Sequence, residues 1–467
     1  MDVSFDRSSS VDSAASGARS LSGPLLFSTF VASLGGLLFG FDVSIMSGAE
    51  EAVRNVFALS SGWLGFTIAS APLGTVFGSI LASKPADVWG RRPVLAVLAV
   101  TYLVSALGCA LAWDWYSLVA FRILGGLGVG AASVIAPLYI AEIAPAKYRG
   151  RLVATVQFNI VLGILLAFLS NYAISRLGLG ATEWRWMLGV QVVPSIVFFV
   201  LSFLIPESPR WLVARGREDE ARRVLLKIGA DEAVDAEIAD IRASLESTGA
   251  GDEDSLFQRR YLKPILLATA IAAFNQLSGI NAVLYYTPSV FKMAGAGGDS
   301  SLLQAVAVGL TNLIFTMLAM TIIDKFGRRA LMIAGSIGYI ISLSVTAWAF
   351  YTYGTHFDGV GGWIVLISLL AFIASHAFGQ GAVIWVYISE VFPNRVRAKG
   401  QALGSVVHWI GALAITQTFP MIAESSGGHA FAFYAAMMVL QLVWVLLAMP
   451  ETKGVPLEEL QKELGLS

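Results

Sequence analysis

The chain has 467 residues, of which 56% are hydrophobic and 13% are charged, and its mean hydropathy is +0.71. Soluble domains carry about 25% charged residues, so this composition excludes a soluble globular chain and predicts a protein that crosses a membrane several times. The formal net charge of -1 and the lack of a basic patch give no support to a nucleic-acid partner.

The first 24 residues are rich in Ser, Ala and Gly and contain no apolar core. This composition excludes a cleaved signal peptide and predicts a disordered cytoplasmic tail. Cys109 is the single cysteine, so no disulfide can form within the chain, and its apolar surroundings predict a small buried side chain.

Apolar stretches of about 20 residues, the length that a helix needs to cross a bilayer, follow along the rest of the chain. They predict an all-α membrane protein with twelve transmembrane helices, near residues 25–47, 62–83, 93–113, 115–140, 152–175, 186–205, 264–291, 301–323, 330–350, 363–389, 400–423 and 430–449.

One long polar segment, 206–260, separates the sixth span from the seventh. Within it, 218–228 and 233–245 place their apolar residues on one helical face, which predicts amphipathic helices at the membrane surface. We therefore expect a six-helix half at 25–205, this segment, a second six-helix half at 261–449 and a cytoplasmic tail at 450–467.

Lys and Arg are concentrated in the central segment and in the loops after the second, fourth, eighth and tenth spans. The loops on the other side offer only Arg54, Arg176, Arg185 and Lys292. Because basic loops stay inside, we expect both termini on the cytoplasmic side of the cell (inner or plasma) membrane.

Three motifs occur twice, in the same order and at nearly the same offset. They are Asp87-Val-Trp-Gly-Arg-Arg and Asp324-Lys-Phe-Gly-Arg-Arg (offset 237), Glu142 to Arg149 and Glu390 to Arg397 (offset 248), and Pro206-Glu-Ser and Pro450-Glu-Thr (offset 244). This repetition predicts two pseudo-symmetric halves with a substrate site between them near the membrane midplane.

The repeated motifs carry acidic and basic side chains at the cytoplasmic ends of the spans. Such pairs can hold helices together when that side is closed and separate when it opens, whereas the alternative is that they only set the topology. The candidates for this gating role are Asp87, Arg91, Glu142, Arg149, Glu207, Arg210, Asp324, Arg328, Glu390, Arg397 and Glu451.

Asp42 is the only charge between Arg19 and Glu50, and it lies within the first span. An ionisable side chain inside a span costs a few kcal/mol or more, so it is a candidate functional residue. The other charge deep in a span is Arg122, in the fourth. If the first span ends near Ser47, both lie roughly 8–10 Å below the outer surface, which predicts that they form a pair.

Two roles are open for this pair. It is either a permanent salt bridge between two helices or a proton-coupling device in which protonation of Asp42 frees Arg122 and removes a charge that resists movement of the halves.

Uncharged polar residues also occur in the spans. Gln276 and Asn281 are five residues apart, about 140° around a straight helix, so they converge on one ligand only if the helix breaks at Ser278-Gly279. Carboxamides suit a ligand rich in hydroxyl groups, and Trp385 and Trp409 offer apolar faces for a sugar ring. Hydrogen bonding between helices is the alternative for any one of these amides.

An ordered set of motifs carries a resemblance to a known family. The set comprises Gly-Arg-Arg after the second and eighth spans, Arg122-Ile-Leu-Gly-Gly-Leu-Gly-Val-Gly, Pro206-Glu-Ser-Pro-Arg-Trp-Leu, Gln276-Leu-Ser-Gly-Ile-Asn281, Ser389-Glu-Val-Phe-Pro and Pro450-Glu-Thr-Lys-Gly. With it, the chain resembles the sugar porters of the major facilitator superfamily from the first span to Leu460.

The resemblance implies the major facilitator fold and a set of sugar-binding residues. The residues on the family's motif positions are Gln157, Gln276, Asn281, Asn312 and Trp385, with Phe39, Tyr285 and Trp409 around them. The Asp at position 42 together with an Arg in the fourth span is similar to bacterial and plant sugar-proton symporters, whereas animal facilitative glucose carriers have Asn.

Two departures from the family bear on the sugar site. Asn275 stands where the family usually has Gln, so its hydrogen bond is lost, relayed by water or aimed at another hydroxyl. Gly379-Gln-Gly-Ala-Val-Ile-Trp385 lacks the usual Gly-Pro, so its glycines must supply the helix break, and Gln380 becomes a further candidate ligand. His408 is either a group that titrates near neutral pH or a satisfied polar residue of the bundle.

Together these features predict a proton-coupled importer of a monosaccharide, a hexose or pentose, that works by alternating access and as a monomer in the lipid bilayer. We expect no enzymatic activity, no cofactor and no metal. The alternatives are a facilitative sugar uniporter, a sugar sensor that does not transport, and a drug-proton antiporter.

Overall fold

The structure is a computed structural model that describes residues 21–229, 234–249, 255–354, 356–357, 359–393 and 395–455, with Asp324 and 247–249 described by their backbone alone. The N-terminal tail expected at 1–24 and the C-terminal tail expected at 450–467 lie mostly outside these residues.

The described residues fold into helices, with two short 3-10 turns at Gly180–Thr182 and Arg259–Tyr261. The helices are α1 Gly23–Val56, α2 Ser61–Leu81, α3 Ser83–Trp89, α4 Arg91–Ala110, α5 Trp115–Ile143, α6 Arg149–Ser175, α7 Glu183–Gly189, α8 Val192–Ser202, α9 Pro209–Ala214, α10 Glu218–Lys227, α11 Val234–Gly249, α12 Leu262–Leu277, α13 Ile280–Met293, α14 Gly298–Phe326, α15 Arg328–Tyr353, α16 Gly359–Phe378, α17 Gln380–Val391, α18 Arg397–Ser425 and α19 Gly427–Leu447.

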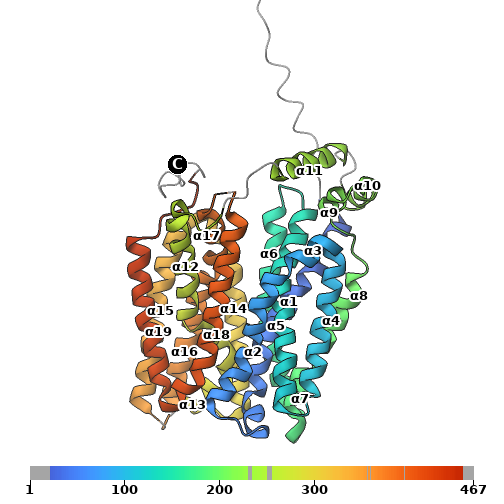
Figure 1. Ribbon diagram of the computed structural model, residues 1–467. Coiled ribbons are helices and arrows are strands. Elements are labelled where there is room, and N and C mark those ends of the chain that lie inside the picture. Colours follow the sequence, from blue (N-terminus) through green and yellow to red (C-terminus); the bar gives the residue numbers. More distant parts are fainter. Residues whose placement is uncertain are drawn as a thin grey trace, which may run out of the picture.

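Two helical bundles stand side by side, one built from α1–α8 and the other from α12–α19 (Figure 1). Within the described residues, twelve helical stretches are long and apolar enough to cross a membrane, which confirms the twelve spans expected from the sequence. Three of these stretches are each split into two helices, namely α7–α8, α12–α13 and α16–α17.

Local sequence signals explain where several helices begin. The hydroxyl of Ser22 accepts a hydrogen bond from the Leu25 N–H, and Pro24 fits the first turn, so α1 begins at Gly23. Asp114 and Ser117 form a reciprocal capping box that starts α5. At its other end α1 continues beyond the predicted Ser47 to Val56, because no breaker interrupts it there.

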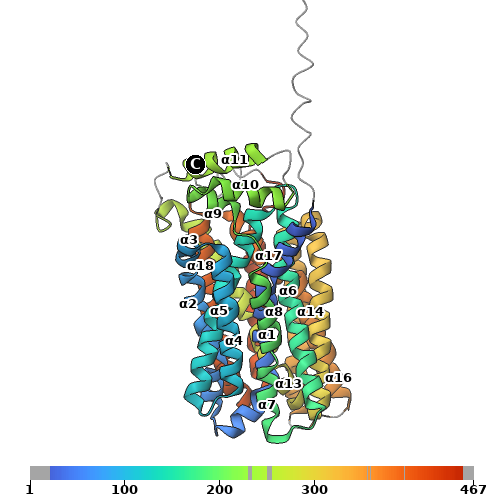
Figure 2. The ribbon, with the colours of Figure 1, turned by 90° about the vertical axis from the view of Figure 1, so that its right-hand side faces the viewer.

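The short helices α9, α10 and α11 cover one end of the first bundle, as Figure 2 shows from the side. The indole N–H of Trp211 and the guanidinium of Arg215 both donate to the Asp87 carbonyl, at 2.8 and 2.7 Å. These contacts tie the central segment to the end of the first half, and α10 and α11 cover the stretches where amphipathic helices are expected.

Large apolar side chains are exposed on the surfaces of the bundles, as on α14 at Leu303, Leu310, Ile314 and Leu318. Water would penalise such a surface, whereas lipid chains would not. The outer surface therefore agrees with a multi-pass membrane protein.

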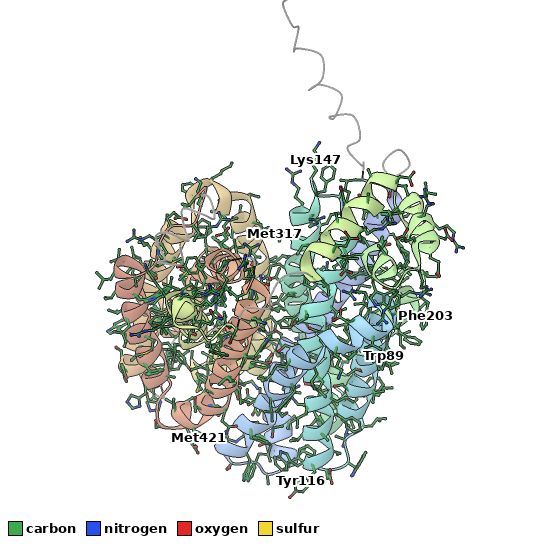
Figure 3. The ribbon with its side chains drawn as sticks, turned by 45° about the horizontal axis from the view of Figure 1, so that its top comes forward. Trp89, Tyr116, Lys147, Phe203, Met317 and Met421 are labelled. Atoms are coloured by element: carbon green, nitrogen blue, oxygen red, sulfur yellow. The ribbon has the colours of Figure 1, made fainter. Side chains whose placement is uncertain are left out.

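The two bundles contact each other through α1 with α13, α2 with α18 and α6 with α14. At the end opposite to α9–α11, the guanidinium of Arg176 lies 2.8 Å from the Asp299 carboxylate, and the amide of Gln417 donates to the Gly62 carbonyl at 2.9 Å. At the α9–α11 end the bundles stand apart (Figure 3).

Candidate functional site

Three amides and one histidine form a polar cluster in the second half. The Gln276 amide donates to Asn275 Oδ1 at 3.0 Å and accepts from Asn281 Nδ2 at 2.8 Å. Nε2 of Gln276 also lies 3.1 Å from a ring nitrogen of His408 on α18. The structure thus brings together three of the predicted sugar ligands, and Gln276 is the centre of the cluster.

A break in the seventh span makes this convergence possible. The helix α12 ends at Leu277, α13 begins at Ile280, and Gly279 between them has φ +82°. Only glycine adopts this left-handed conformation without strain, so Gly279 turns the chain and brings Asn281 toward Gln276. The break predicted at Ser278-Gly279 is confirmed.

Aromatic rings surround the amide cluster and reach across the boundary between the halves. The ring centroid of Phe39 on α1 lies 5.6 Å from the ring centroid of Trp409 on α18. The ring centroid of His408 lies 5.1 Å from that of Trp385 and 5.0 Å from that of Trp409. Trp385 is 40% exposed although it lies within a membrane span, Gly359–Val391. Its ring is therefore accessible next to the amides.

The remaining predicted ligands are spread around this cluster. Tyr285 is buried on α13, on the side of the second half that lies near Arg122. Asn312 is buried on α14 and its Oδ1 lies 3.4 Å from the Thr316 hydroxyl. Gln157 is half-buried on α6 of the first half.

Gln380 differs from the other candidates because both ends of its amide are engaged away from the cluster. It is fully buried, its Nε2 donates to Gln441, and its Oε1 accepts from the Tyr339 hydroxyl at 3.4 Å. The amide therefore lies within the second half, bonded to α15 and α19.

Asp42 and Arg122 are both buried in the first half, at 5% and 2% exposure. Arg122 acts electrostatically on Asp42, but no ion pair joins these two described side chains in this conformation. Instead, the guanidinium donates to the carbonyls of Thr67 at 3.2 Å and Ile68 at 3.3 Å. The side chain of Gln191 lies near Asp42.

Two residues at the site were not assigned a role from the sequence. Gln191 lies at the junction of α7 and α8, and a single glutamine in the apolar sixth span was the available signal. His408 was expected either to titrate or to be a satisfied polar residue, and it lies directly on the amide cluster. A histidine next to a tryptophan in an apolar span was the available signal.

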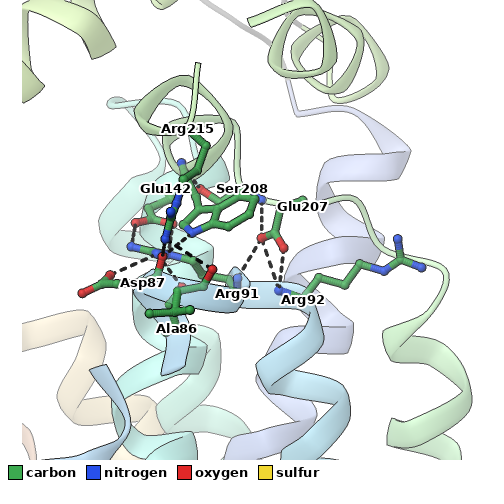
Figure 4. Close-up of polar contacts among 10 residues, drawn as sticks. Ala86, Asp87, Arg91, Arg92, Glu142, Glu207, Ser208 and Arg215 are labelled. Atoms are coloured by element: carbon green, nitrogen blue, oxygen red, sulfur yellow. Dashed lines mark hydrogen bonds and ion pairs between the residues drawn. The ribbon is translucent and has the colours of Figure 1, made fainter. Parts of the chain in front are cut away.

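A cluster of charges ties together the α9–α11 end of the first half (Figure 4). The guanidinium of Arg91 on α4 forms a two-point contact with Glu142 on α5, with both N–O distances 2.8 Å, and also contacts Asp87 at 3.2 Å. Glu207 accepts from the backbone N–H groups of Arg91 and Arg92. Burial raises the pKa of Glu207, although these N–H donors act in the opposite direction.

The second half repeats this arrangement. Arg328 contacts Glu390 at 2.8 and 3.1 Å, and Glu451 accepts from the backbone N–H groups of Arg328 and Arg329. Burial raises the pKa of Glu451, but four backbone N–H donors outweigh it and hold the pKa below its ordinary value. The repeated geometry explains the repeated motifs, and each cluster lies within one half.

The other gating candidates lie outside these two clusters. Arg210 donates to Ser244 at 3.2 Å, Arg397 donates to the Phe392 carbonyl at 3.4 Å, and Arg149 is exposed at the start of α6. The side chain of Asp324 lies outside the described part of the chain. Among the described residues, no group of three or more His, Cys, Asp or Glu side chains is arranged to hold a metal ion.

The sequence profile of one family, described as sugar (and other) transporter, matches residues 28–464. The chain belongs to this family. Relatives of known name match nearly the whole length of the chain. The D-xylose-proton symporter of Escherichia coli (strain K12) is 37% identical over 471 residues, covering 93% of this chain and 94% of the relative.

A second relative is the arabinose-proton symporter of Bacillus subtilis (strain 168), which is 35% identical over 436 residues, covering 92% of this chain and 93% of the relative. The fold is also similar to a solved structure, the inward open conformation of the xylose transporter XylE from E. coli, with a TM-score of 0.83 and 36% identity over 93% of this chain and 98% of that one. These similarities confirm the expected family and fold class.

Proposed function

We infer that the protein imports a monosaccharide together with a proton and works by alternating access. The observation that carries this inference is the Gln276–Asn281 amide pair, which lies across a helix break and beside the boundary where Phe39 meets Trp409. An amide both donates and accepts, as each sugar hydroxyl does, and aromatic rings cover the apolar face of a sugar. The relatives named as sugar-proton symporters support the same function.

The sugar is held by the amide cluster and by the rings around it. Gln276, Asn281 and Asn275 bond its hydroxyl groups, and Trp385 and Trp409 pack on its ring. The first half contributes Phe39 and Gln157, and Tyr285 and Asn312 complete the site. A site shared by both halves lets sugar binding favour their movement past one another.

Asp42 is the proton site and Arg122 is its counter-charge. Their separation in this conformation argues against a permanent salt bridge, because the guanidinium of Arg122 donates to the carbonyls of Thr67 and Ile68 and not to Asp42. Protonation of Asp42 removes its attraction to Arg122 and allows this arrangement. Tyr285, which is buried near both, connects the pair to the sugar site.

The α9–α11 end faces the cytoplasm, and both termini lie on that side of the plasma membrane. The basic loops are the support for this orientation. The bundles stand apart at this end and contact each other at the other, so the conformation is inward-facing. The protein functions as a monomer in the lipid bilayer, since each chain contains both halves of the site.

The charged clusters at the cytoplasmic end have a gating role that acts through each half separately. Arg91–Glu142 and Arg328–Glu390 stay formed while the bundles stand apart at this end. They therefore keep the helices of each half together as one body, so that the halves move as units.

Uptake into proteoliposomes containing the purified protein tests the function. With an imposed inward proton gradient, labelled xylose, arabinose or glucose should accumulate above its outside concentration, and dissipating the gradient should abolish the accumulation. A facilitative uniporter would equilibrate sugar without accumulating it, and a sensor would bind without uptake. An antiporter would drive its substrate outward under the same gradient.

A further inference from the structure

A proline inside the second span leaves one backbone carbonyl without its helical donor. In an α-helix each carbonyl accepts from the N–H four residues later, and proline has no N–H, so Pro72 on α2 cannot donate to the Ile68 carbonyl. Ile68 is fully buried. Since the interior of a membrane offers no water to bond a freed carbonyl, this group needs a donor from another part of the protein.

Arg122 supplies that donor from α5. Its Nη2 donates to the Ile68 carbonyl at 3.3 Å, and its Nε donates to the neighbouring Thr67 carbonyl at 3.2 Å. The backbones of α2 and α5 lie close together here, because a Cβ at Gly126 would collide with the carbonyl oxygen of Ala71. This close packing brings the freed carbonyl within reach of the guanidinium.

The same pattern occurs in the second half. Pro420 lies inside α18 and cannot donate to the Thr416 carbonyl, four residues earlier. The hydroxyl of Tyr286 on α13 donates to this carbonyl at 2.9 Å. In both halves, a carbonyl freed by proline thus accepts a hydrogen bond from a buried side chain of a neighbouring helix.

Asp42 is a second acceptor within range of Arg122. Its Oδ1 would lie 3.4 Å from a Cβ at Gly125, and Gly125 follows Arg122 by three residues on α5, so the carboxylate lies along the same side of that helix. The other titratable side chains near this pair are Tyr102 and Cys109 on α4 and Tyr285 and Tyr286 on α13. Thiols and phenols are uncharged near pH 7, so among the described residues Arg122 is the charge that faces Asp42.

We propose that Pro72 is a positioning residue that gives the Arg122 guanidinium a second place, on the Ile68 carbonyl, when it leaves Asp42. This inference rests on the proposed role of Asp42 as the proton site. An ionised Asp42 attracts the guanidinium, and once Asp42 is protonated the carbonyl freed by Pro72 holds it. Arg122 therefore has acceptors in both states, and its release from Asp42 leaves no unsatisfied charge inside the membrane.

Replacing Pro72 by Ala restores the N–H, which then competes with Arg122 for the Ile68 carbonyl. The guanidinium should stay nearer to Asp42, and an adjacent positive charge favours the ionised carboxylate. The protonated carboxyl group of Asp42 is followed by infrared absorption, as the band that is missing in Asp42→Asn. In the purified full chain without sugar, the pH at which half of this band is lost should fall by about one unit in Pro72→Ala, a tenfold shift of the equilibrium.

Pro137→Ala is the matched control. It also restores an N–H inside a span of the first half, but Pro137 lies 15 residues beyond Arg122 on α5, about 20 Å along the axis. The half-titration pH of Asp42 should therefore be unchanged in Pro137→Ala. In an Arg122→Gln background, Pro72→Ala should likewise have no effect, because the proline acts through the guanidinium.

An unchanged half-titration pH in Pro72→Ala, or a shift to higher pH, overturns the proposal. A shift of the same size in Pro137→Ala or in the Arg122→Gln background overturns it as well, because the effect would then not depend on Arg122. If the wild-type protein accumulates no sugar, the proposed function fails, while the titration of Asp42 still decides whether Pro72 places the guanidinium.

Discussion

The carboxylate of Glu50 accepts a hydrogen bond from the Ser289 hydroxyl, and this contact crosses the boundary between the two halves. Glu50 is buried on α1 and Ser289 lies on α13. Close by, Glu51 pairs with Lys292 across the same boundary. A charged acceptor strengthens a hydrogen bond from which water is excluded, so this contact helps to hold the outer end closed.

Removing the Ser289 hydroxyl should open the outer end. Ser289→Ala leaves the Glu50 carboxylate buried without its donor, and a hydrogen bond to a charged group is worth about 1.5–3 kcal/mol. We therefore expect the sugar-free equilibrium to shift toward the outward-open state by about 10- to 100-fold. Distances between spin labels on the outer ends of α1 and α13 measure this shift.

Arg176→Ala is the control for this prediction. Its ion pair with Asp299 crosses the same boundary, but both side chains are more than half exposed, so its loss should shift the equilibrium by less than about fivefold. An effect of Arg176→Ala as large as that of Ser289→Ala would mean that the burial of Glu50 is unimportant.

Replacing Asp42 by Asn should separate sugar accumulation from sugar exchange. Asn keeps the size of the side chain but cannot take up a proton. A proton that crosses 100 mV supplies about 2.3 kcal/mol, which sustains a sugar gradient of about fiftyfold. We expect this gradient to be lost in Asp42→Asn, whereas exchange of labelled for unlabelled sugar continues. Uptake and counterflow in proteoliposomes measure both.

Ser44→Ala provides the matched control on the same helix. The Ser44 hydroxyl is buried and has no hydrogen-bond partner, so its removal should leave both activities intact. Equal loss of accumulation and exchange in Asp42→Asn would show that Asp42 is needed for the movement itself, and would argue against its assignment as the proton site.

The sequence predicts those parts of the protein whose physical signal is local. A charge in an apolar run identifies Asp42 and Arg122. Ser278-Gly279 between two amides identifies the break of the seventh span, where the structure has Gly279 in the left-handed conformation. The repeated acidic motifs predict the clusters of Arg91 and Arg328, since each depends on a short loop with a fixed sequence.

Contacts between distant segments were not predictable in the same way. Equal depth in the membrane predicts a pair between Asp42 and Arg122, yet depth does not define rotation about the helix axis, and in this conformation Arg122 donates to backbone carbonyls of α2. Gln380 fits a ligand position by sequence, but its amide points to Gln441 on α19, a neighbour that no spacing along the chain reveals.

Replacing Arg91 by Leu should destabilise the first half. Its pair with Glu142 is largely buried, with 10% and 6% of the side chains exposed, so removal of Arg91 leaves a buried carboxylate without its partner. Such a loss costs about 3–5 kcal/mol. In Arg91→Leu/Glu142→Leu, no unpaired charge remains, and part of the stability should return. Unfolding by denaturant in detergent measures both variants.

Arg222→Ala is the control for an ion pair in the same region. Its partner is Asp235, and 46% and 83% of the two side chains are exposed, so the change should cost less than about 1 kcal/mol. If the double variant is no more stable than Arg91→Leu, the buried charge is not the cause of the loss.

The matching carboxylates Glu207 and Glu451 should respond to pH in opposite directions. Burial raises the pKa of Glu207 above its ordinary value of 4.5, so the folded state keeps this proton longer than the unfolded state, and stability from this site falls as pH rises above about 4.5. The pKa of Glu451 is lowered by its backbone N–H donors, which outweigh burial, so its contribution is present above 4.5 and is lost as pH falls below it.

Replacement of each carboxylate by Gln isolates its contribution. As pH is raised above 4.5, the wild type loses the stability that protonated Glu207 contributes, whereas Glu207→Gln has no such loss. The melting temperature of Glu207→Gln minus that of the wild type should therefore increase across this window. As pH is raised toward 4.5 from below, the wild type gains the stability that ionised Glu451 contributes, whereas Glu451→Gln does not. The melting temperature of Glu451→Gln minus that of the wild type should therefore decrease across this window. Thermal unfolding in detergent across both windows measures these differences. If this difference in melting temperature changed in the same direction for both variants, the pKa values of Glu207 and Glu451 would be shifted in the same direction. That result would contradict the assignment of opposite shifts to the two carboxylates.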